Sequence, residues 1–166
     1  SPQGKDLHFT FGYDILDRPV GESLPLPDGN RNYYGDAYYY SGCVYGNSSL
    51  NRIRETYGPG AAWIENGKSV KTEYLINADS GELSCAEFRA EDNGEDVRLI
   101  RSGLYAAGEL SVARTTDEDG KVVYTFTDFE GKLLLTRRMN GTEPHDTYIV
   151  YDDRGRKRIV LPPLAA

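Results

Sequence analysis

Apolar and polar positions alternate over much of the C-terminal half of the chain, and this pattern predicts β-strands. Val122, Tyr124 and Phe126 occupy every second position, so an extended chain places these three side chains on one face. Tyr148 and Val150 repeat the pattern further along. No stretch sustains the periodicity of about 3.6 residues that marks an amphipathic helix, so we expect an all-β chain with no helix longer than about three turns.

An Asp-x-x-Gly sequence follows each of these apolar runs and predicts a hairpin turn. Aspartate suits the first position of a type I turn, where its carboxylate accepts hydrogen bonds from backbone N–H groups further on. The glycine then supplies the positive φ that closes the hairpin through a bulge. Apolar runs return after the turns, at residues 133–135 and 159–161. The predicted structural turn residues are Asp117, Gly120, Asp128, Gly131, Asp152 and Gly155.

Residues 61–88 have the pattern of a further hairpin unit. Asn66-Gly67 is a strong signal for a two-residue hairpin turn, and residues 70–76 alternate as a strand. Residues 77–81 are expected to turn, and residues 83–88 to return beside that strand. The unit therefore predicts one more antiparallel hairpin.

Two further expectations concern the segment that follows. Residues 97–100 are expected to form one helical turn, and residues 110–116 to form a strand that pairs with residues 121–127. Together the hairpins predict a curved, twisted antiparallel sheet.

Turn-forming residues dominate the N-terminal part of the chain. Residues 8–14 alternate as one strand, whereas the prolines in residues 24–29 exclude a central strand because each removes a ladder donor. Residues 30–51 are expected to form a long loop with short pieces of strand. The sequence thus predicts a turn-rich segment at 1–60 and a β-hairpin repeat segment at 61–166, within one structural unit.

A tyrosine cluster in the N-terminal segment is the best candidate for ligand binding. Aromatic faces stack on sugar rings, and tyrosine is frequent at recognition surfaces. The alternative is that these side chains plug the open end of a curved sheet, since tyrosine is also an ordinary strand residue. The candidate residues are Tyr33, Tyr34, Tyr38, Tyr39, Tyr40 and Tyr45.

Composition and charge narrow the possible partners. The chain has 166 residues with 18 glycines and 13 tyrosines, which fits a single domain of many short strands and tight turns. A net charge of −7 disfavours nucleic acid and anionic membranes as partners. No apolar run approaches the ~20 residues that span a bilayer. No signal peptide is visible after Ser1, and we expect the chain to be a piece of a longer protein.

The sequence offers no catalytic or metal-binding set. Cys43 and Cys85 are either small apolar strand residues or the two halves of a single disulfide. These two cysteines and the two histidines are too far apart in the sequence to predict a metal site. The acidic turn at residues 117–120 lacks the ligands of a calcium loop. The acidic pairs 91–92 and 152–153 fall in expected exposed turns. The basic residues are expected to face solvent and pair across strands, and comprise Arg137, Arg138, Arg154, Arg156, Lys157 and Arg158.

An ordered series of motifs carries a family resemblance. Residues 151–156, Tyr-Asp-Asp-Arg-Gly-Arg, resemble the core of a tyrosine–aspartate (YD) repeat, as in Rhs and teneurin proteins. One departure is Ala78, which stands where the turn aspartate is expected in residues 77–81. The wider series is similar to Rhs-repeat proteins of Bacteroidetes bacteria and comprises residues 117–121, 126–132, 147–152 and 160–163, preceded by residues 11–14, 18–19, 24–27, 49–52 and 59–63.

The resemblance implies a structural protein and not an enzyme. In such families the hairpins spiral into a hollow shell that can enclose a polymorphic toxin, and related proteins act in adhesion. It implies a cell-surface or secreted protein, no cofactor, and the rest of the parent chain as the main partner. The alternative function is a carbohydrate- or protein-binding module that uses the tyrosine cluster. We also expect weak self-association through an open strand edge at residues 156–161.

Overall fold

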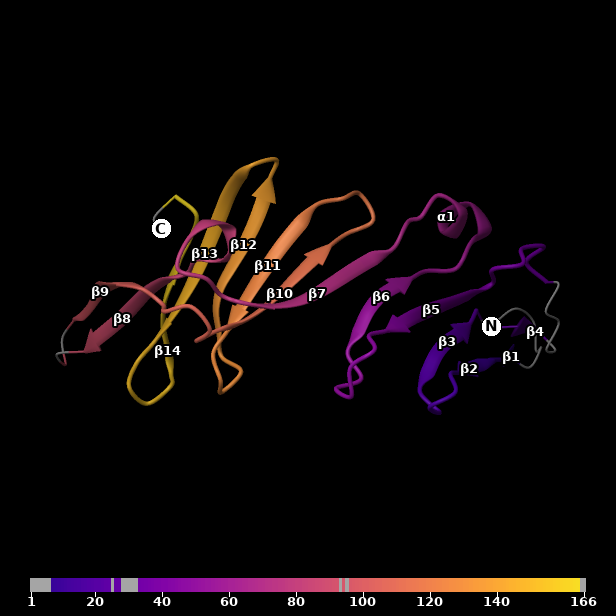
Figure 1. Ribbon diagram of the computed structural model, residues 1–166, viewed down its shortest axis with the longest axis horizontal. Coiled ribbons are helices and arrows are strands. Elements are labelled where there is room, and N and C mark those ends of the chain that lie inside the picture. The colour runs from indigo at the N-terminus through magenta and orange to yellow at the C-terminus, as the bar shows by residue number, and fades with distance from the viewer. Residues whose placement is uncertain (1–6, 25, 28–32, 93, 95, 165–166) are drawn as a thin grey trace. The chain divides into compact units, whose positions relative to one another are not determined.

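The computed structural model describes residues 7–24, 26–27, 33–92, 94 and 96–164. The chain divides into two compact units (Figure 1). The N-terminal unit comprises Ser1–Thr72 with Asp117–Asp119, and the C-terminal unit comprises Glu73–Thr116 with Gly120–Ala166. Strands account for 51% of the residues and helices for 5%, which confirms the prediction of an all-β, antiparallel chain. Within the described residues the longest helix has five residues, well below three turns.

Five consecutive strands of the C-terminal unit form an antiparallel meander: β10 (Ser111–Thr116), β11 (Val122–Thr127), β12 (Leu133–Asn140), β13 (Glu143–Tyr151) and β14 (Lys157–Leu161). Each strand pairs with the next along the chain. This confirms the predicted pairing of residues 110–116 with 121–127. Strand β7 (Val70–Ile76), whose C-terminal part belongs to this unit, is the other neighbour of β10. At the opposite end, β14 is the edge strand.

Alternate residues from the meander build one row of the core. Val112 lies opposite Phe126, and Phe126 lies opposite Leu135. Beyond Leu135 the row continues with Tyr148 and then Leu161. All five side chains are buried, because the register places them on the same face of neighbouring strands. The alternation in the sequence therefore marks the core-facing side, as predicted.

A separate hairpin packs on this core. It consists of β8 (Ala86–Asp92) and β9 (Val97–Leu104), which pair only with each other among the described strands. Phe88 of β8 meets Tyr148 of β13 edge to face, with ring centroids 4.9 Å apart. The Ala86 N–H donates to the Tyr148 hydroxyl over 3.4 Å. The hairpin thus adds a second layer to the meander.

This hairpin corrects two sequence expectations. Residues 83–88 do not return beside residues 70–76, because β7 takes β10 as its partner and β8 takes β9. Residues 97–100 are the start of a strand and not a helical turn. A short apolar run does not separate helix from strand by periodicity alone, and here pairing with β8 decides the outcome.

Asn77 holds the segment that leaves β7. Its side chain is buried, and its Oδ1 accepts from the Leu110 N–H over 2.8 Å while its Nδ2 donates to the Ala106 carbonyl over 2.8 Å. The Asn77 N–H donates to the Leu110 carbonyl over 3.0 Å. The chain then passes into a short 3₁₀ helix, η1 (Gly81–Leu83). The expected turn at 77–81 is therefore an anchor to a distant loop and not the tip of a hairpin.

Arg137 is the one basic residue of the predicted solvent-facing group that the structure buries, with 7% of its surface exposed. Its guanidinium forms a two-point ion pair with Asp146, at 2.7 Å from Nε and 2.6 Å from Nη2. Its Nη1 donates to the carbonyls of Glu82 and Ser84 over 2.7 and 3.0 Å. The pairing across strands was predicted, but the burial was not. Arg137 thereby ties the segment around η1 to the meander.

The N-terminal unit is a second antiparallel array, made of β2 (Phe11–Tyr13), β3 (Pro19–Ser23), β5 (Tyr40–Tyr45), β6 (Ile53–Tyr57) and the start of β7. A two-stranded sheet pairs β1 (Leu7–His8) with β4 (Leu26–Pro27). Residues 8–14 are therefore not one strand, since the chain changes sheets between β1 and β2. The proline segment contributes only the two-residue β4, and residues 25 and 28–29 lie outside the described residues. The expected long loop at 30–51 contains the six-residue strand β5.

The α-helix α1 (Ala61–Glu65), the only one among the described residues, overturns the expected hairpin at Asn66-Gly67. Gly67 has a φ of 66°, and its N–H donates to the Ile64 carbonyl over 2.9 Å. The Lys68 N–H donates to the Trp63 carbonyl over 3.0 Å. These two bonds are the Schellman motif that ends helices. The left-handed conformation that the dipeptide favours is present, but it closes a helix and not a hairpin.

Candidate functional site

The Asp-x-x-Gly turns have the geometry that the sequence predicts. Asp128 Oδ1 accepts from the N–H groups of Glu130 and Lys132 over 2.9 and 2.8 Å. Gly131 has a φ of 80°. A register shift between Phe126 and Thr127 marks the bulge beside this turn. The aspartate thus fixes the turn through the backbone, and the glycine takes the conformation that other residues avoid.

The other turns repeat this arrangement. Asp152 Oδ1 accepts from the N–H groups of Arg154 and Arg156 over 3.0 and 2.9 Å, and Gly155 has a φ of 72°. In the turn between β10 and β11, Asp117 Oδ1 accepts from the Asp119 N–H over 3.0 Å. Gly120 there has a φ of 80°. The six predicted turn residues therefore lie in the connections between paired strands, and all three glycines have a positive φ, but only the β11–β12 and β13–β14 pairings show a register shift beside the turn.

Replacing Gly131 with valine should destabilise the C-terminal unit by about 1–3 kcal/mol, the strain of a β-branched residue at positive φ. No heavy atom outside the adjoining residues lies within 4 Å of a Cβ built at Gly131, so the effect comes from the backbone and not from a clash. Gly58 is a matched control, because it has equally open surroundings and no positive φ. Denaturant unfolding of both variants checks this, and an equal loss in Gly58→Val would contradict the assignment.

Asp152 makes the β13–β14 turn sensitive to acid. Hydrogen bonds from the Arg156 N–H, the Arg156 side chain and the Arg154 N–H hold the pKa of its carboxyl below the usual value, against an opposing effect of desolvation. A lowered folded-state pKa adds stability that is present above the unfolded-state value of about 3.9 and is lost as the pH falls through the folded-state pKa. Asp152→Asn should therefore weaken the loss of stability in acid. Unfolding titrations across acidic pH check this, with Asp153→Asn as the control that keeps the turn hydrogen bonds.

The structure separates the predicted tyrosine cluster into three groups. Tyr33 and Tyr34 are exposed and meet edge to face, with centroids 5.1 Å apart. Tyr45 lies under the Arg18 guanidinium, 4.3 Å from the ring centroid, and donates its hydroxyl to the Pro19 carbonyl. The remaining three rings contact one another through Tyr40, which lies 6.1 Å from Tyr38 and 5.9 Å from Tyr39. The six residues are not one binding surface.

Two of these tyrosines line a groove in the N-terminal unit. Tyr39 and Tyr40 face it together with Tyr57 and Phe11, and it has a volume of about 270 Å³. Gly42 permits the position of Tyr57, because a Cβ there would come within 2.4 Å of the tyrosine ring. Sequence reasoning missed Tyr57, since its strand β6 is paired with β5 only in the folded chain.

Both cysteines are free thiols, which corrects the disulfide alternative. Cys85 is fully buried in the core of the C-terminal unit, and burial raises the pKa of its thiol to about 12. Cys43 lies in β5 of the N-terminal unit, where its Sγ is 3.3 Å from the Pro19 carbonyl. Cys85 is therefore a small apolar core residue that is protonated at neutral pH.

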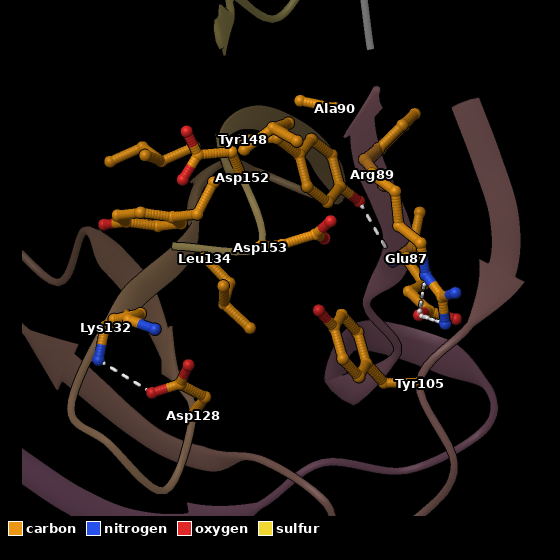
Figure 2. Close-up of a pocket in the computed structure, with 15 residues that line it drawn as sticks. Glu87, Arg89, Ala90, Tyr105, Asp128, Lys132, Leu134, Tyr148, Asp152 and Asp153 are labelled. Atoms are coloured by element: carbon orange, nitrogen blue, oxygen red, sulfur yellow. Dashed lines mark hydrogen bonds and ion pairs between the residues drawn. The ribbon is translucent and has the colours of Figure 1, made fainter. Parts of the chain in front are cut away.

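A pocket of about 260 Å³ opens in the C-terminal unit beside the Asp128–Gly131 and Asp152–Gly155 turns (Figure 2). One wall is the β8 hairpin with Glu87 and Arg89, which form a 2.7 Å ion pair. The opposite wall comes from β12, β13 and the turns that follow β11 and β13. Tyr105, from the loop after β9, closes one side. The pocket therefore joins segments that are far apart in the sequence.

The oxygen-bearing side chains around this pocket differ in how many hydrogen bonds and ion pairs they already form. Asp152 is engaged by backbone N–H groups and by Arg156, at 2.8 Å. Asp128 uses Oδ1 for its turn. The Asp153 carboxylate and the Tyr105 hydroxyl form no hydrogen bond or ion pair with another described residue. The sequence analysis identified Asp153 only as one residue of the acidic pair 152–153 in an expected exposed turn. No sequence pattern indicated that Tyr105 would line a pocket.

Within the described part of the chain, no three His, Cys, Asp or Glu side chains cluster in a way that could hold a metal ion. The same residues include no helix long and apolar enough to cross a membrane.

One family model matches part of the chain in the comparisons with known proteins. Residues 1–76 match the family described as "Domain of unknown function (DUF6443)". The matched segment includes the groove-lining residues Phe11, Tyr39, Tyr40 and Tyr57. No curated protein and no solved structure matches the chain. The pocket beside the Asp128–Gly131 and Asp152–Gly155 turns lies wholly outside the matched residues.

Proposed function

We propose that the chain is a non-catalytic structural segment of a cell-surface or secreted Rhs/YD-repeat protein of the Bacteroidetes type, whose hairpins build a β shell or stalk. The observation that carries the proposal is the repeated turn. The turns Asp128–Gly131 and Asp152–Gly155 follow β11 and β13, the first strands of two successive hairpins, with the same carboxylate-to-backbone bonds and a positive φ at each glycine. Repeat units of this kind bury their apolar faces against their neighbours. The main partner is then the remainder of the parent chain.

The edge strand β14 supplies the test of this proposal. It pairs with β13 on one side only, and Val160 is half exposed. Open strand edges pair with other chains. We expect the present chain to self-associate weakly through β14, and more strongly at high salt, because salt screens the repulsion between Lys157 and Arg158 of neighbouring copies. Light scattering at low and high salt measures this.

A second experiment repeats these measurements on a longer chain, which includes any residues that the reading frame encodes after Ala166. A further hairpin paired with β14 should raise the free energy of unfolding and abolish the self-association. A sequence that lacks another YD hairpin, or an extension that leaves both properties unchanged, would count against the proposal.

The alternative function is a carbohydrate-binding module, and the groove of the N-terminal unit favours it. Tyr39, Tyr40 and Tyr57 give the groove aromatic faces of the kind that stack on sugar rings. A glycan array tests this directly. Binding that is lost in Tyr57→Ala and retained in Tyr33→Ala, an exposed tyrosine outside the groove, would support the alternative. An array on which no glycan binds the chain would contradict the carbohydrate-binding alternative.

A further inference from the structure

A turn in the N-terminal unit repeats the hydrogen bonds of the β13–β14 turn. Asp14 Oδ1 accepts from the N–H groups two and four positions further along the chain, over 2.9 and 3.1 Å. Asp152 Oδ1 accepts from the two corresponding N–H groups. Asp17 has a φ of 58° and stands where the β13–β14 turn has Gly155. The β2–β3 turn is therefore built like the Asp-x-x-Gly turns, although aspartate replaces the glycine.

The arginine that ends the β2–β3 turn covers a tyrosine of the next hairpin. The Arg18 guanidinium lies 4.3 Å from the centroid of the Tyr45 ring, and Tyr45 is the last residue of β5. The Tyr45 hydroxyl donates to the carbonyl of Pro19, the residue after the arginine, over 3.0 Å. Arg18 Nη1 also donates over 3.0 Å to Asn51 Oδ1, in the β5–β6 turn. One cation and one carbonyl thus hold the tyrosine that precedes the adjoining turn.

The C-terminal unit has the same joint between β12 and β13. Lys132 occupies the fifth position of the turn after β11, and its Nζ lies 5.9 Å from the centroid of the Tyr151 ring. The Tyr151 hydroxyl donates to the carbonyl of Leu133, the residue after the lysine, over 3.2 Å. In both units the register of the two strands, continued to the turn, brings the cation opposite the tyrosine. The joint is therefore a repeated contact between neighbouring hairpins.

Strand β14 presents the cation of a third joint without its tyrosine. Arg156 is paired with Asp152 at 2.8 Å, as Arg18 is paired with Asp14 at 2.5 Å. However, 57% of the Arg156 side chain is exposed, against 19% of the Arg18 side chain. Among the described residues no aromatic ring lies over the Arg156 guanidinium. Because β14 is the edge strand of its sheet, the position that Tyr45 occupies in the first joint is open here.

We propose that Arg156 and the carbonyl of Lys157 form a docking site for a tyrosine, the last residue of a strand that pairs antiparallel with β14. The ring lies against the guanidinium and the hydroxyl donates to the carbonyl, as in the two joints within the chain. A cation over a tyrosine face is attracted to it, and a buried tyrosine hydroxyl needs a hydrogen-bond partner.

The occupant of this site is the next hairpin of the parent chain, so the inference rests on the proposed function. It adds the residue that sets the register of that hairpin. A slip of one residue would turn the tyrosine ring to the other face of the sheet, away from Arg156.

The test extends the chain after Leu161 by Asn-Gly-Thr and a second copy of residues 147–161. Asn-Gly favours a two-residue hairpin turn, which brings the copied Tyr151 opposite Arg156. We expect the side-chain proton signals of Arg156 to move upfield, because the tyrosine ring shields protons over its face. Arg18 is the reference in the same spectrum, since it already lies over Tyr45. Tyr151→Leu in the added copy should return the Arg156 signals to their positions in the chain without the extension.

A pair of arginine variants tests the contribution of the cation. Arg156→Ala should lower the protection of the β14 amides from hydrogen exchange more in the extended chain than in the present one. Arg154→Ala is the matched control, because Arg154 is an exposed residue of the same turn and should have equal effects in both chains. Equal effects of Arg156→Ala in the two chains would overturn the docking site.

Hydrogen exchange separates failure of the docking site from failure of the proposed function. Newly protected β14 amides with upfield Arg156 signals would support both. Newly protected β14 amides with unchanged Arg156 signals would overturn the docking site and leave the structural role standing. Unprotected β14 amides would count against both, because β14 would then not accept a further hairpin.

Discussion

Replacing Arg137 with methionine should destabilise the C-terminal unit by about 3–5 kcal/mol, the usual cost of breaking a buried ion pair from one side. The substitution leaves Asp146 without its two-point partner in a site where both side chains are largely buried. It also removes the donor that the carbonyls of Glu82 and Ser84 share. Denaturant unfolding followed by far-ultraviolet circular dichroism measures the loss.

Two further variants separate the ion pair from the side chain itself. Arg138→Met changes the neighbouring, exposed arginine and should alter stability by less than about 0.5 kcal/mol. The double variant Arg137→Met with Asp146→Leu removes both charges, so it should recover part of the stability. A double variant no more stable than Arg137→Met would show that the two carbonyl contacts, and not the ion pair, carry the effect.

Replacing Phe126 with alanine should cost about 3–5 kcal/mol, the range for removing a large aromatic side chain from a core. Phe126 is fully buried in the middle of the core row, opposite both Val112 and Leu135. The Arg137 guanidinium lies over its ring at 5.8 Å, so the cavity would also loosen that contact. The surrounding sheet has little freedom to collapse into the space.

Phe129 provides the matched control for this substitution. It lies only three positions further along, in the turn, but 85% of its surface is exposed. Phe129→Ala should therefore leave the free energy of unfolding within about 0.5 kcal/mol. The single tryptophan, Trp63, lies in α1 of the N-terminal unit, so its fluorescence reports that unit separately. Equal losses in the two phenylalanine variants would contradict the assignment of the core face.

The parts of the fold that the sequence predicts are those determined locally. Asp128 and Gly131 form their turn from residues that are neighbours in the chain, so the motif carries nearly all the necessary information. Alternation similarly marks Phe126 and Tyr148 as core residues, because side-chain direction in a strand depends only on position.

Interactions between distant segments account for the errors. The Asn66-Gly67 dipeptide favours a left-handed conformation in a hairpin and at a helix end alike, and contacts with preceding residues decide between them. The burial of Arg137 depends on a loop more than fifty positions away that is brought against its strand, as its bond to the Glu82 carbonyl shows. No local pattern identifies that loop.

The candidate sites show the same difference between features determined locally and features that depend on contacts between distant segments. The sequence identified aromatic residues as binding candidates, but it grouped Tyr33 and Tyr45 with Tyr40, although the three lie in separate clusters. The groove depends on Tyr57, which pairing of β6 with β5 brings alongside. Tyr105 reaches its pocket from a loop that shares no motif with the turns it faces. Patterns in a single sequence therefore do not predict sites built from several loops, because the loops come together only in the folded chain.

The most direct test of the central claim, that this chain is a structural segment of a longer YD-repeat array, is the structure of the full-length protein by cryo-electron microscopy. We expect the open side of β14 to pair with a further antiparallel hairpin, and that hairpin to turn at another Asp-x-x-Gly with a positive φ at its glycine. A full-length structure in which the open side of β14 faces solvent, and in which no such hairpin follows, would contradict the account.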